Sequence, residues 1–226
     1  KTPTALDTAS INLADYLSKT LENDIFNIAL TEVAYTLQVG RSAFDYRRSV
    51  VCQTVDEAVE KLRGKSSQKI GEQSSIVFSF SGQGSQHANM AKSLYESEPT
   101  FKEALDQCAE ILSEKEISLL EIVYSESASD QINQTIYAQL ALFAVEYALA
   151  QLWISWGVTP TALIGHSIGE YVAACLAGVF DLQTALHIVS LRGQLMQQMP
   201  GGGFVAATPA VAFPFNPQFQ VGELTL

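Results

Sequence analysis

A serine between two glycines, placed between an apolar run and an alanine-rich segment, is the feature that most constrains the fold of this chain. Residues 161–164 predict a short buried strand, and residues 171–178 predict a helix. Residues 165–170 between them have the sequence GHSIGE. This order of strand, Gly-x-Ser-x-Gly turn and helix is that of a nucleophile elbow, in which glycines remove side chains that would collide with neighbouring backbone. The pattern therefore predicts the Ser167 hydroxyl at the tip of a strained turn, beside the positive end of a helix.

The same segment has a second interpretation as an ordinary helix start. Ser167 and Glu170 have the Ser-x-x-Glu spacing of a capping box, in which the serine side chain accepts a hydrogen bond from the first helical turn. The motif alone leaves the nucleophile and the N-cap interpretations open, so the rest of the chain must decide between them.

The composition is typical of a folded globular protein and narrows the possible partners. Of the 226 residues, 47% are hydrophobic and 16% charged, which predicts a packed core in one or two modest domains. The net charge of −11 argues against nucleic acid and anionic membranes as partners. Cys52, Cys108 and Cys175 are widely spaced, which fits a reducing cytoplasm and argues against a disulfide framework or a metal site. The chain starts at Lys1 without a signal-peptide pattern, so we expect a cytoplasmic piece of a longer protein.

Residues 1–72 predict a small α+β domain without a set of side chains typical of catalysis. Thr54 and Glu57 form a capping box that opens its last helix. Residues 1–10 are expected to be frayed, and helices are expected at residues 12–23 and 25–38. A strand at residues 46–53, the capped helix at residues 54–62 and a polar linker at residues 64–75 are expected to follow.

A second apolar strand is expected over residues 76–80, and a glycine-rich turn, residues 81–86 (SGQGSQ), follows it directly. Such a turn places backbone N–H groups at the carboxyl edge of a parallel sheet, where ligands of open α/β sheets bind. It lacks the third glycine of a dinucleotide-binding fingerprint. Taken alone, it is equally consistent with a simple tight turn.

Besides the helix at residues 171–178, four helices are expected in this second region, at residues 87–96, 99–114, 132–156 and 181–199. The third is apolar nearly all round and is long enough to span a membrane. Glu146 lies in its middle, Gln139 and Gln151 interrupt it, and no Lys or Arg flanks it. A helix buried in a soluble core therefore explains it better than a membrane span.

Arg192 is an isolated cation, because the other 12 of the 13 basic residues lie at or before Lys115. It falls on the apolar stripe of the helix at residues 181–199. A buried guanidinium without a partner costs several kcal/mol. The guanidinium group of Arg192 could reach solvent, pair with a structural acid such as Glu170, or bind a substrate carboxylate.

Four motifs in register resemble the acyltransferase domain of modular polyketide synthases and the related malonyl-CoA:acyl-carrier-protein transacylases. They lie in residues 80–86 (FSGQGSQ), 137–142 (YAQLAL), 165–170 (GHSIGE) and 191–197 (LRGQLMQ). Residues 33–41 (VAYTLQVGR) also resemble the linker between the ketosynthase and acyltransferase domains of such synthases.

The resemblance implies an α/β fold in three parts. Residues 1–72 would be the small α+β linker domain, and residues 73–204 the N-terminal part of an α/β-hydrolase-like acyltransferase core with a parallel sheet. Residues 205–226 would be an irregular tail, and the family's ferredoxin-like subdomain would be absent.

The resemblance also implies a mechanism of covalent acyl transfer. Ser167 would attack the thioester of an acyl-CoA, hold the acyl group as an ester and pass it to the phosphopantetheine thiol of an acyl carrier protein. The backbone N–H groups of Gln83 and Ile168 would form the oxyanion hole. This reaction loads extender units in polyketide or fatty acid biosynthesis.

Three further residues map onto substrate-binding positions of the family: Arg192, His166 and Gln139. Arg192 matches the clamp for the free carboxylate of malonyl-type units, a role that suits the bidentate geometry of guanidinium. Ile168, next to the nucleophile, resembles malonyl-selective members. His166 supports the site in this comparison and is not the general base.

The family's catalytic histidine lies well downstream of the serine, beyond the end of this chain. The fragment by itself is therefore expected to be nearly inert, because a serine without its base is a weak nucleophile. His87 and His187 are expected to be structural. No metal or bound cofactor is expected, and the expected partners are malonyl-CoA, the acyl carrier protein and the ketosynthase domain of the same polypeptide.

The family's pattern is not matched everywhere. Ser81 and Leu140 each replace a common proline, and the segment after Gly203 departs from the family. Two rival interpretations remain. An α/β-hydrolase such as a thioesterase shares the serine elbow but has no use for the glycine-rich turn or Arg192. A non-catalytic scaffold piece of a synthase is the other.

Overall fold

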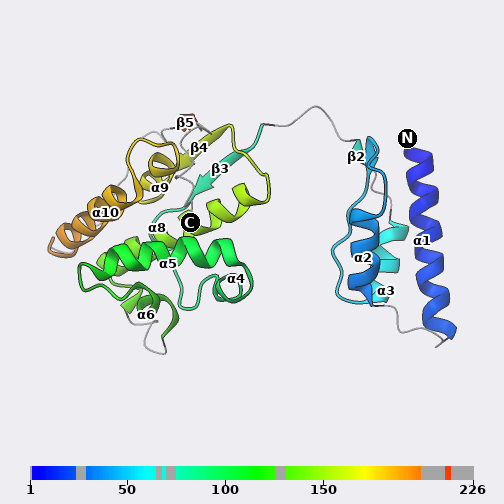
Figure 1. The fold of residues 1–226 in the computed structure, drawn as a ribbon, viewed down its shortest axis with the longest axis horizontal. Coiled ribbons are helices and arrows are strands. Elements are labelled where there is room, and N and C mark those ends of the chain that lie inside the picture. Colours follow the sequence, from blue (N-terminus) through cyan, green and yellow to red (C-terminus); the bar gives the residue numbers. More distant parts are fainter. Residues whose placement is uncertain are drawn as a thin grey trace, which may run out of the picture. The chain divides into compact units, whose positions relative to one another are not determined.

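The computed structural model describes residues 2–23, 29–64, 68–69, 75–125, 131–199 and 212–214. The chain divides into two compact units, Lys1–Ser74 and Ser75–Leu226, which are described separately. Figure 1 shows the elements of both units.

The first unit is built on two helices that pack against each other. Its elements in chain order are α1 (Pro3–Asn23), α2 (Leu30–Val39), β1 (Tyr46–Arg47), α3 (Val55–Arg63) and β2 (Gln68–Lys69). α1 and α3 bury a small core that contains Ala14, Leu17 and Ala58. The predicted capping box is confirmed, since Thr54 accepts a hydrogen bond from the Glu57 N–H.

Two predictions for this unit are wrong. Residues 3–10 are helical instead of frayed, because their polar side chains are satisfied within the helix: Thr2 Oγ1 accepts from Ala5 N, and the Ser10 hydroxyl donates to Leu6 O. The strand expected over residues 46–53 is only two residues long. This strand pairs antiparallel with β2. Val51 beyond it is 87% exposed and pairs with no strand in the described residues, so its high β-propensity does not extend the strand.

The second unit has a small mixed sheet in the order β3-β4-β5. β3 (Val77–Phe80) and β4 (Ala162–Gly165) are parallel, with Phe80 opposite Gly165, so their carboxyl ends meet at one edge. β5 (Ala212–Pro214) pairs antiparallel with β4. The prediction of an irregular tail over residues 205–226 is therefore wrong at these three residues. A strand of three residues is too short to show alternating polarity in the sequence. The other residues of 205–226 lie outside the described residues. The α/β fold class is confirmed.

Six helices are described with this sheet: α4 (Lys92–Ser97), α5 (Pro99–Ser113), α6 (Leu119–Tyr124), α8 (Thr135–Ser155), α9 (Gly169–Leu176) and α10 (Leu182–Gln197). α4 begins later than predicted, because Asn89 and Ala91 have positive φ angles of 61° and 55°. α6 was not predicted from the sequence.

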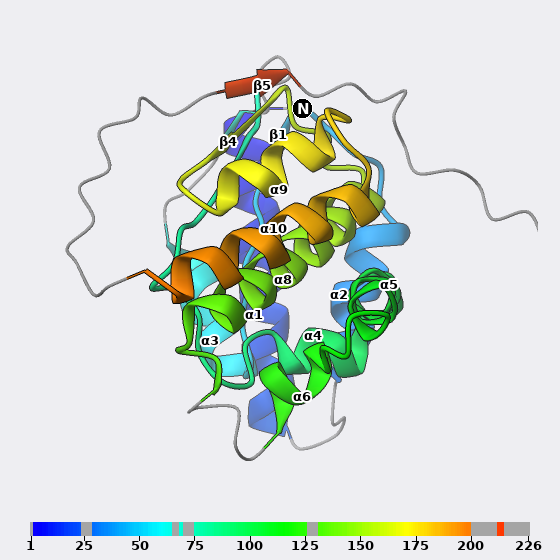
Figure 2. The same ribbon diagram turned by 90° about the vertical axis from the view of Figure 1, so that its left-hand side faces the viewer.

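α8 is the central helix of the second unit. It packs against α5, α9 and α10, and Figure 2 shows α10 lying along it. By length and composition alone α8 could cross a membrane, but 67% of its most apolar window is buried within the chain. The packing agrees with the prediction of a core helix.

Gly193 allows α8 and α10 to approach closely. A Cβ built on Gly193 would lie 2.9 Å from the Cα of Ile136, a backbone atom that cannot rotate away. The contact brings the helix that carries Arg192 against the helix that carries Gln139.

Replacing Gly193 should therefore separate these helices. We expect Gly193→Val to lower the free energy of unfolding by about 1–3 kcal/mol, the usual cost of overpacking. Thermal unfolding measures this, with Gln194→Ala, an exposed change on the same helix, as control. Equal Tm values for the two variants would contradict the close contact.

Glu146 is a carboxyl within the apolar helix α8. Its Oε1 accepts hydrogen bonds from the backbone N–H and the hydroxyl of Ser81, and its Oε2 is buried without a partner among the described residues. Burial raises the pKa of the Glu146 carboxyl, against the Ser81 hydrogen bonds, which lower it.

This shift has a direct consequence for stability. The pKa of the Glu146 carboxyl is higher in the folded chain than in the unfolded chain. The protonated carboxyl therefore contributes fully to stability at low pH, and this contribution is lost as the pH rises through the raised pKa. We expect Glu146→Gln to be more stable than the wild type at neutral pH. The difference should vanish as the pH falls below about 4. Denaturant unfolding from pH 4 to pH 8 measures it, and a difference that does not depend on pH would contradict the shift.

Candidate active site

Ser167 lies on a sharp turn between β4 and α9, with a positive φ of 54°. The glycines on both sides are sterically required. A Cβ on Gly165 would lie 2.1 Å from the backbone N of Glu170, and one on Gly169 would lie 2.5 Å from the carbonyl O of Phe80. The chain therefore has the geometry of a nucleophile elbow, with strain at the residue that carries the hydroxyl.

The alternative of an ordinary N-cap is wrong. The N-cap position of α9 is Ile168, and no side chain caps this helix. The Glu170 N–H bonds to the backbone carbonyl of Ser167, not to its hydroxyl. Instead, Ser167 Oγ accepts a hydrogen bond from Arg192 Nη2 at 3.2 Å.

The glycine-rich loop, residues 81–86, lies against the elbow. The His166 N–H donates to Phe80 O at 3.0 Å, and a Cβ on Gly82 would lie 2.4 Å from His166 Nδ1. The exposed His166 ring thus packs against the loop. Within the described residues, the backbone N–H groups of Gln83 and Ile168 have no hydrogen-bond partner. Both donors predicted for the oxyanion hole are therefore available.

Arg192 extends from α10 to the elbow. Its guanidinium carbon lies 5.6 Å from the centroid of the Tyr171 ring, a cation–π distance. No Asp or Glu among the described residues forms an ion pair with it, so the predicted alternative of a pair with Glu170 is not observed. Tyr171 was not predicted as a site residue, although its position four residues after Ser167, at the start of the predicted helix, was a usable signal.

Gln139 lies behind the loop. Its side chain is 0% exposed, and its Nε2 donates to Gln83 Oε1 and to Met196 Sδ, both at 3.3 Å. Its Oε1 is buried without a partner in the described part of the chain. Gln139 therefore connects the loop to α10, and a direct contact with substrate stays a prediction.

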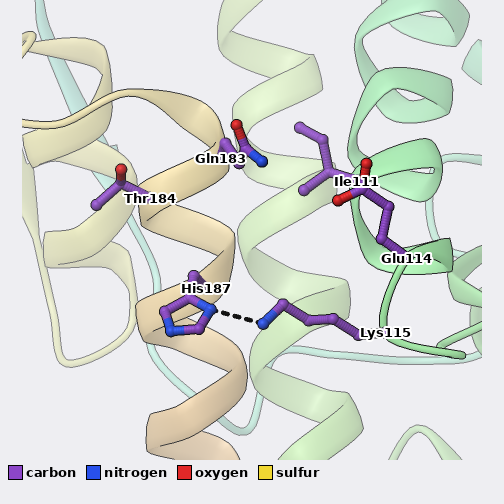
Figure 3. A pocket seen from close by; sticks show the side chains of 6 residues that line it. All are labelled: Ile111, Glu114, Lys115, Gln183, Thr184 and His187. Carbon is purple, nitrogen blue, oxygen red and sulfur yellow. Dashed lines mark hydrogen bonds between the residues drawn. The ribbon is translucent and has the colours of Figure 1, made fainter.

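The other two histidines are not at the serine. His87 lies on the loop's far end, with Nδ1 3.4 Å from Ser85 O. His187 lies in an open groove of about 460 Å³ between α5 and α10, where Lys115 Nζ is 2.6 Å from its Nδ1 (Figure 3). Among the described residues, no histidine is hydrogen-bonded to Ser167 Oγ.

Comparison with known families agrees with this geometry. A family model described as "Acyl transferase domain" matches residues 77–213, and one described as "CurL-like, PKS C-terminal" matches residues 1–62. The chain is 38% identical over 177 residues to an orsellinic acid synthase of Armillaria mellea, covering 76% of this chain and 8% of the relative. It is 51% identical over 132 residues to one subunit of the phenolphthiocerol/phthiocerol polyketide synthase of Mycobacterium tuberculosis, covering 58% of this chain and 9% of the relative.

Solved structures give the same result. The acyl transferase domain of ZmaA superposes with a TM-score of 0.81 at 40% identity, covering 89% of this chain and 48% of that one. An acyl carrier protein S-malonyltransferase of Vibrio cholerae superposes with a TM-score of 0.52 at 38% identity, covering 57% and 42%. The chain thus spans about half the length of the acyl transferase domain of ZmaA and about a tenth or less of the curated synthases. Its family match, elbow and glycine-rich loop together show that this chain belongs to the acyl transferase domain family.

Proposed function

We propose that the second unit, within a longer synthase polypeptide, transfers a malonyl-type acyl group from coenzyme A to the phosphopantetheine thiol of an acyl carrier protein. The group would be held in between as an ester of Ser167. Two solved relatives support this chemistry: one is a malonyl-transacylase in complex with a type II polyketide synthase acyl carrier protein, and the other an acyl transferase domain in complex with a substituted malonyl group.

The observation that carries this proposal is the position of Arg192. Its guanidinium reaches the nucleophile, is half-buried, and has no carboxylate partner among the described residues. An acyl group with a free carboxylate would supply the missing partner while its thioester lies at Ser167 Oγ. A simple thioesterase has no need of such a cation.

The acylation step uses three groups of this chain. Ser167 Oγ attacks the thioester carbonyl, the C–S bond breaks, and coenzyme A leaves as its thiol with the serine proton. The N–H groups of Gln83 and Ile168 would donate to the oxyanion of the tetrahedral intermediate. In the second step the carrier thiol attacks the ester and Ser167 recovers its proton.

The proton transfers require a general base that the described residues do not bring to Ser167. We propose that it is a histidine downstream of residue 226, as in the resembling family. The Arg192 hydrogen bond leaves the Ser167 hydroxyl proton free to be donated to such a base, because the arginine can only donate.

The first unit offers a surface for the ketosynthase domain of the same polypeptide, which we propose as its partner. α2 has no buried residue, although it carries Tyr35, Leu37 and Val39, all exposed. A helix with this apolar content is expected to be covered by another domain.

Acylation should occur at Ser167 alone. In the complete synthase polypeptide with its carrier domain lacking phosphopantetheine, so that no acceptor thiol removes the group, we expect malonyl-CoA to add one malonyl group within seconds, and Ser167→Ala to abolish it. Intact-protein and peptide mass spectrometry measure this, and Ser97→Ala, at an exposed serine of α4, is the matched control. Residues 1–226 alone should label little or not at all; rapid stoichiometric labelling of this fragment would overturn the need for a downstream base.

Arg192 should determine the selectivity for a free carboxylate. We expect Arg192→Ala to lower kcat/KM for malonyl-CoA by about 10²-fold, the loss of a charge-assisted bidentate contact, while acetyl transfer survives or improves. Arg192→Lys should restore little, because ammonium lacks the planar fork. Steady-state transfer to a carrier protein measures both substrates, with Gln194→Ala as control. Equal losses for malonyl and acetyl would count against the clamp.

A further inference from the structure

Three polar residues of α8 lie on one face of this largely apolar helix. Thr135, Gln139 and Glu146 are four and seven residues apart, a spacing that keeps them in line. Each of them contacts the glycine-rich loop. Thr135 Oγ1 accepts from Gln83 Nε2 at 3.3 Å, Gln139 Nε2 donates to Gln83 Oε1 at 3.3 Å, and Glu146 accepts from Ser81.

The Glu146 contact fixes the point where the loop leaves β3. Ser81 directly follows Phe80, the last residue of β3, and gives both its backbone N–H, at 2.9 Å, and its hydroxyl to Glu146 Oε1. The Ser85 hydroxyl lies 2.7 Å from Ser81 Oγ and 3.1 Å from Gly82 O. These bonds tie the start of the loop to its end, with Gln83 between them.

Holding a loop with a partly buried carboxyl costs desolvation free energy. Glu146 Oε2 has no partner among the described residues, and an apolar side chain of similar size would avoid the desolvation cost. Stability therefore does not explain an acid here. An acceptor that holds two donors of Ser81 does explain it, because it fixes the direction of the next backbone amides.

We propose that Glu146 is a positioning residue that orients the Gln83 N–H toward the oxyanion formed at Ser167. This inference rests on the proposed acyl transfer. Glu146 bonds to Ser81 and acts through the loop, so it touches neither substrate nor the reacting atoms. An oxyanion donor acts in the transition state, so its misalignment lowers kcat and leaves substrate binding nearly unchanged.

The kinetic test compares Glu146→Leu with Glu146→Gln in the complete synthase polypeptide. Leu removes the acceptor, and we expect kcat for malonyl transfer to fall about 10- to 10²-fold with KM within about twofold. Gln keeps an acceptor oxygen and should stay within about threefold of the wild type. Gln151→Leu, on the same helix and away from the loop, is the matched control.

Two kinetic results would overturn the proposal. One is an unchanged kcat in Glu146→Leu, or a fall matched by the control. The other is a fall in Glu146→Gln as large as in Glu146→Leu, which would mean that the charge and not the hydrogen bond matters.

A second variant keeps the test independent of the stability of Glu146→Leu. Ser81→Ala removes the hydroxyl bond from the loop side, and we expect it to lower kcat by about threefold to tenfold. If the two residues act as one unit, Ser81→Ala combined with Glu146→Leu should be no slower than Glu146→Leu alone by more than about threefold, whereas independent residues would multiply their losses. The shared role would be contradicted if the fall in kcat of the double variant equalled the product of the two single falls, or if kcat did not fall in Ser81→Ala.

Hydrogen exchange of the complete synthase polypeptide, read from the peptides that contain Ser81, separates this inference from the proposed function. In Glu146→Leu, we expect the Ser81 amide to exchange at least about tenfold faster, with the amides of β4 unchanged. Absence of acyl transfer in the wild-type synthase would refute the proposed function alone. Unchanged exchange at Ser81 would refute the positioning role, whatever the activity.

Discussion

The contact between the nucleophile turn and the end of β3 is the constraint on which the second unit depends. The Cα of Gly169 packs directly onto the carbonyl groups of Phe80 and Ser81, with no room for a Cβ. The Phe80 carbonyl also accepts the His166 N–H. Because backbone meets backbone on both sides, the elbow and the glycine-rich loop cannot shift independently. Two segments that are far apart in the sequence, the loop that carries Gln83 and the elbow that carries Ile168, are therefore held against each other.

α8 extends this constraint from the backbone to the side chains. It holds the loop through Thr135 and Glu146, and it contacts α10 closely at Gly193, one residue after Arg192. Gln139 joins the loop and α10 through a single amide. The glycine-rich loop and α10 are thus both held by one buried helix, and a rigid element positions a site more accurately than loops do. Three of the polar residues of α8, Thr135, Gln139 and Glu146, make these contacts, whereas Gln151 lies further along the helix.

The sequence predicted the parts of the fold that depend on local chemistry. The elbow glycines, the Thr54 cap and the apolar α8 follow from steric, hydrogen-bonding and burial rules that act within a few residues. It failed where partners are distant: the shortness of β1, the addition of β5 and the Ser81–Glu146 bond depend on segments that meet only in the fold. Arg192 was singled out by its isolation in the sequence, but its hydrogen bond to Ser167 and its place over Tyr171 required coordinates.

Under the proposed function, the isolated cation would allow a net acidic chain to select an anionic acyl group. Arg192 is partly withdrawn from water, and within the described residues no carboxylate offsets that cost. The Tyr171 ring lies under the guanidinium without competing for its N–H donors, so most of these donors stay available. A ligand carboxylate that replaces the lost hydration recovers part of the desolvation cost when it binds, which an uncharged acyl group cannot do. An ion pair between Glu170 and Arg192 would have removed this advantage, and no such pair is observed among the described residues.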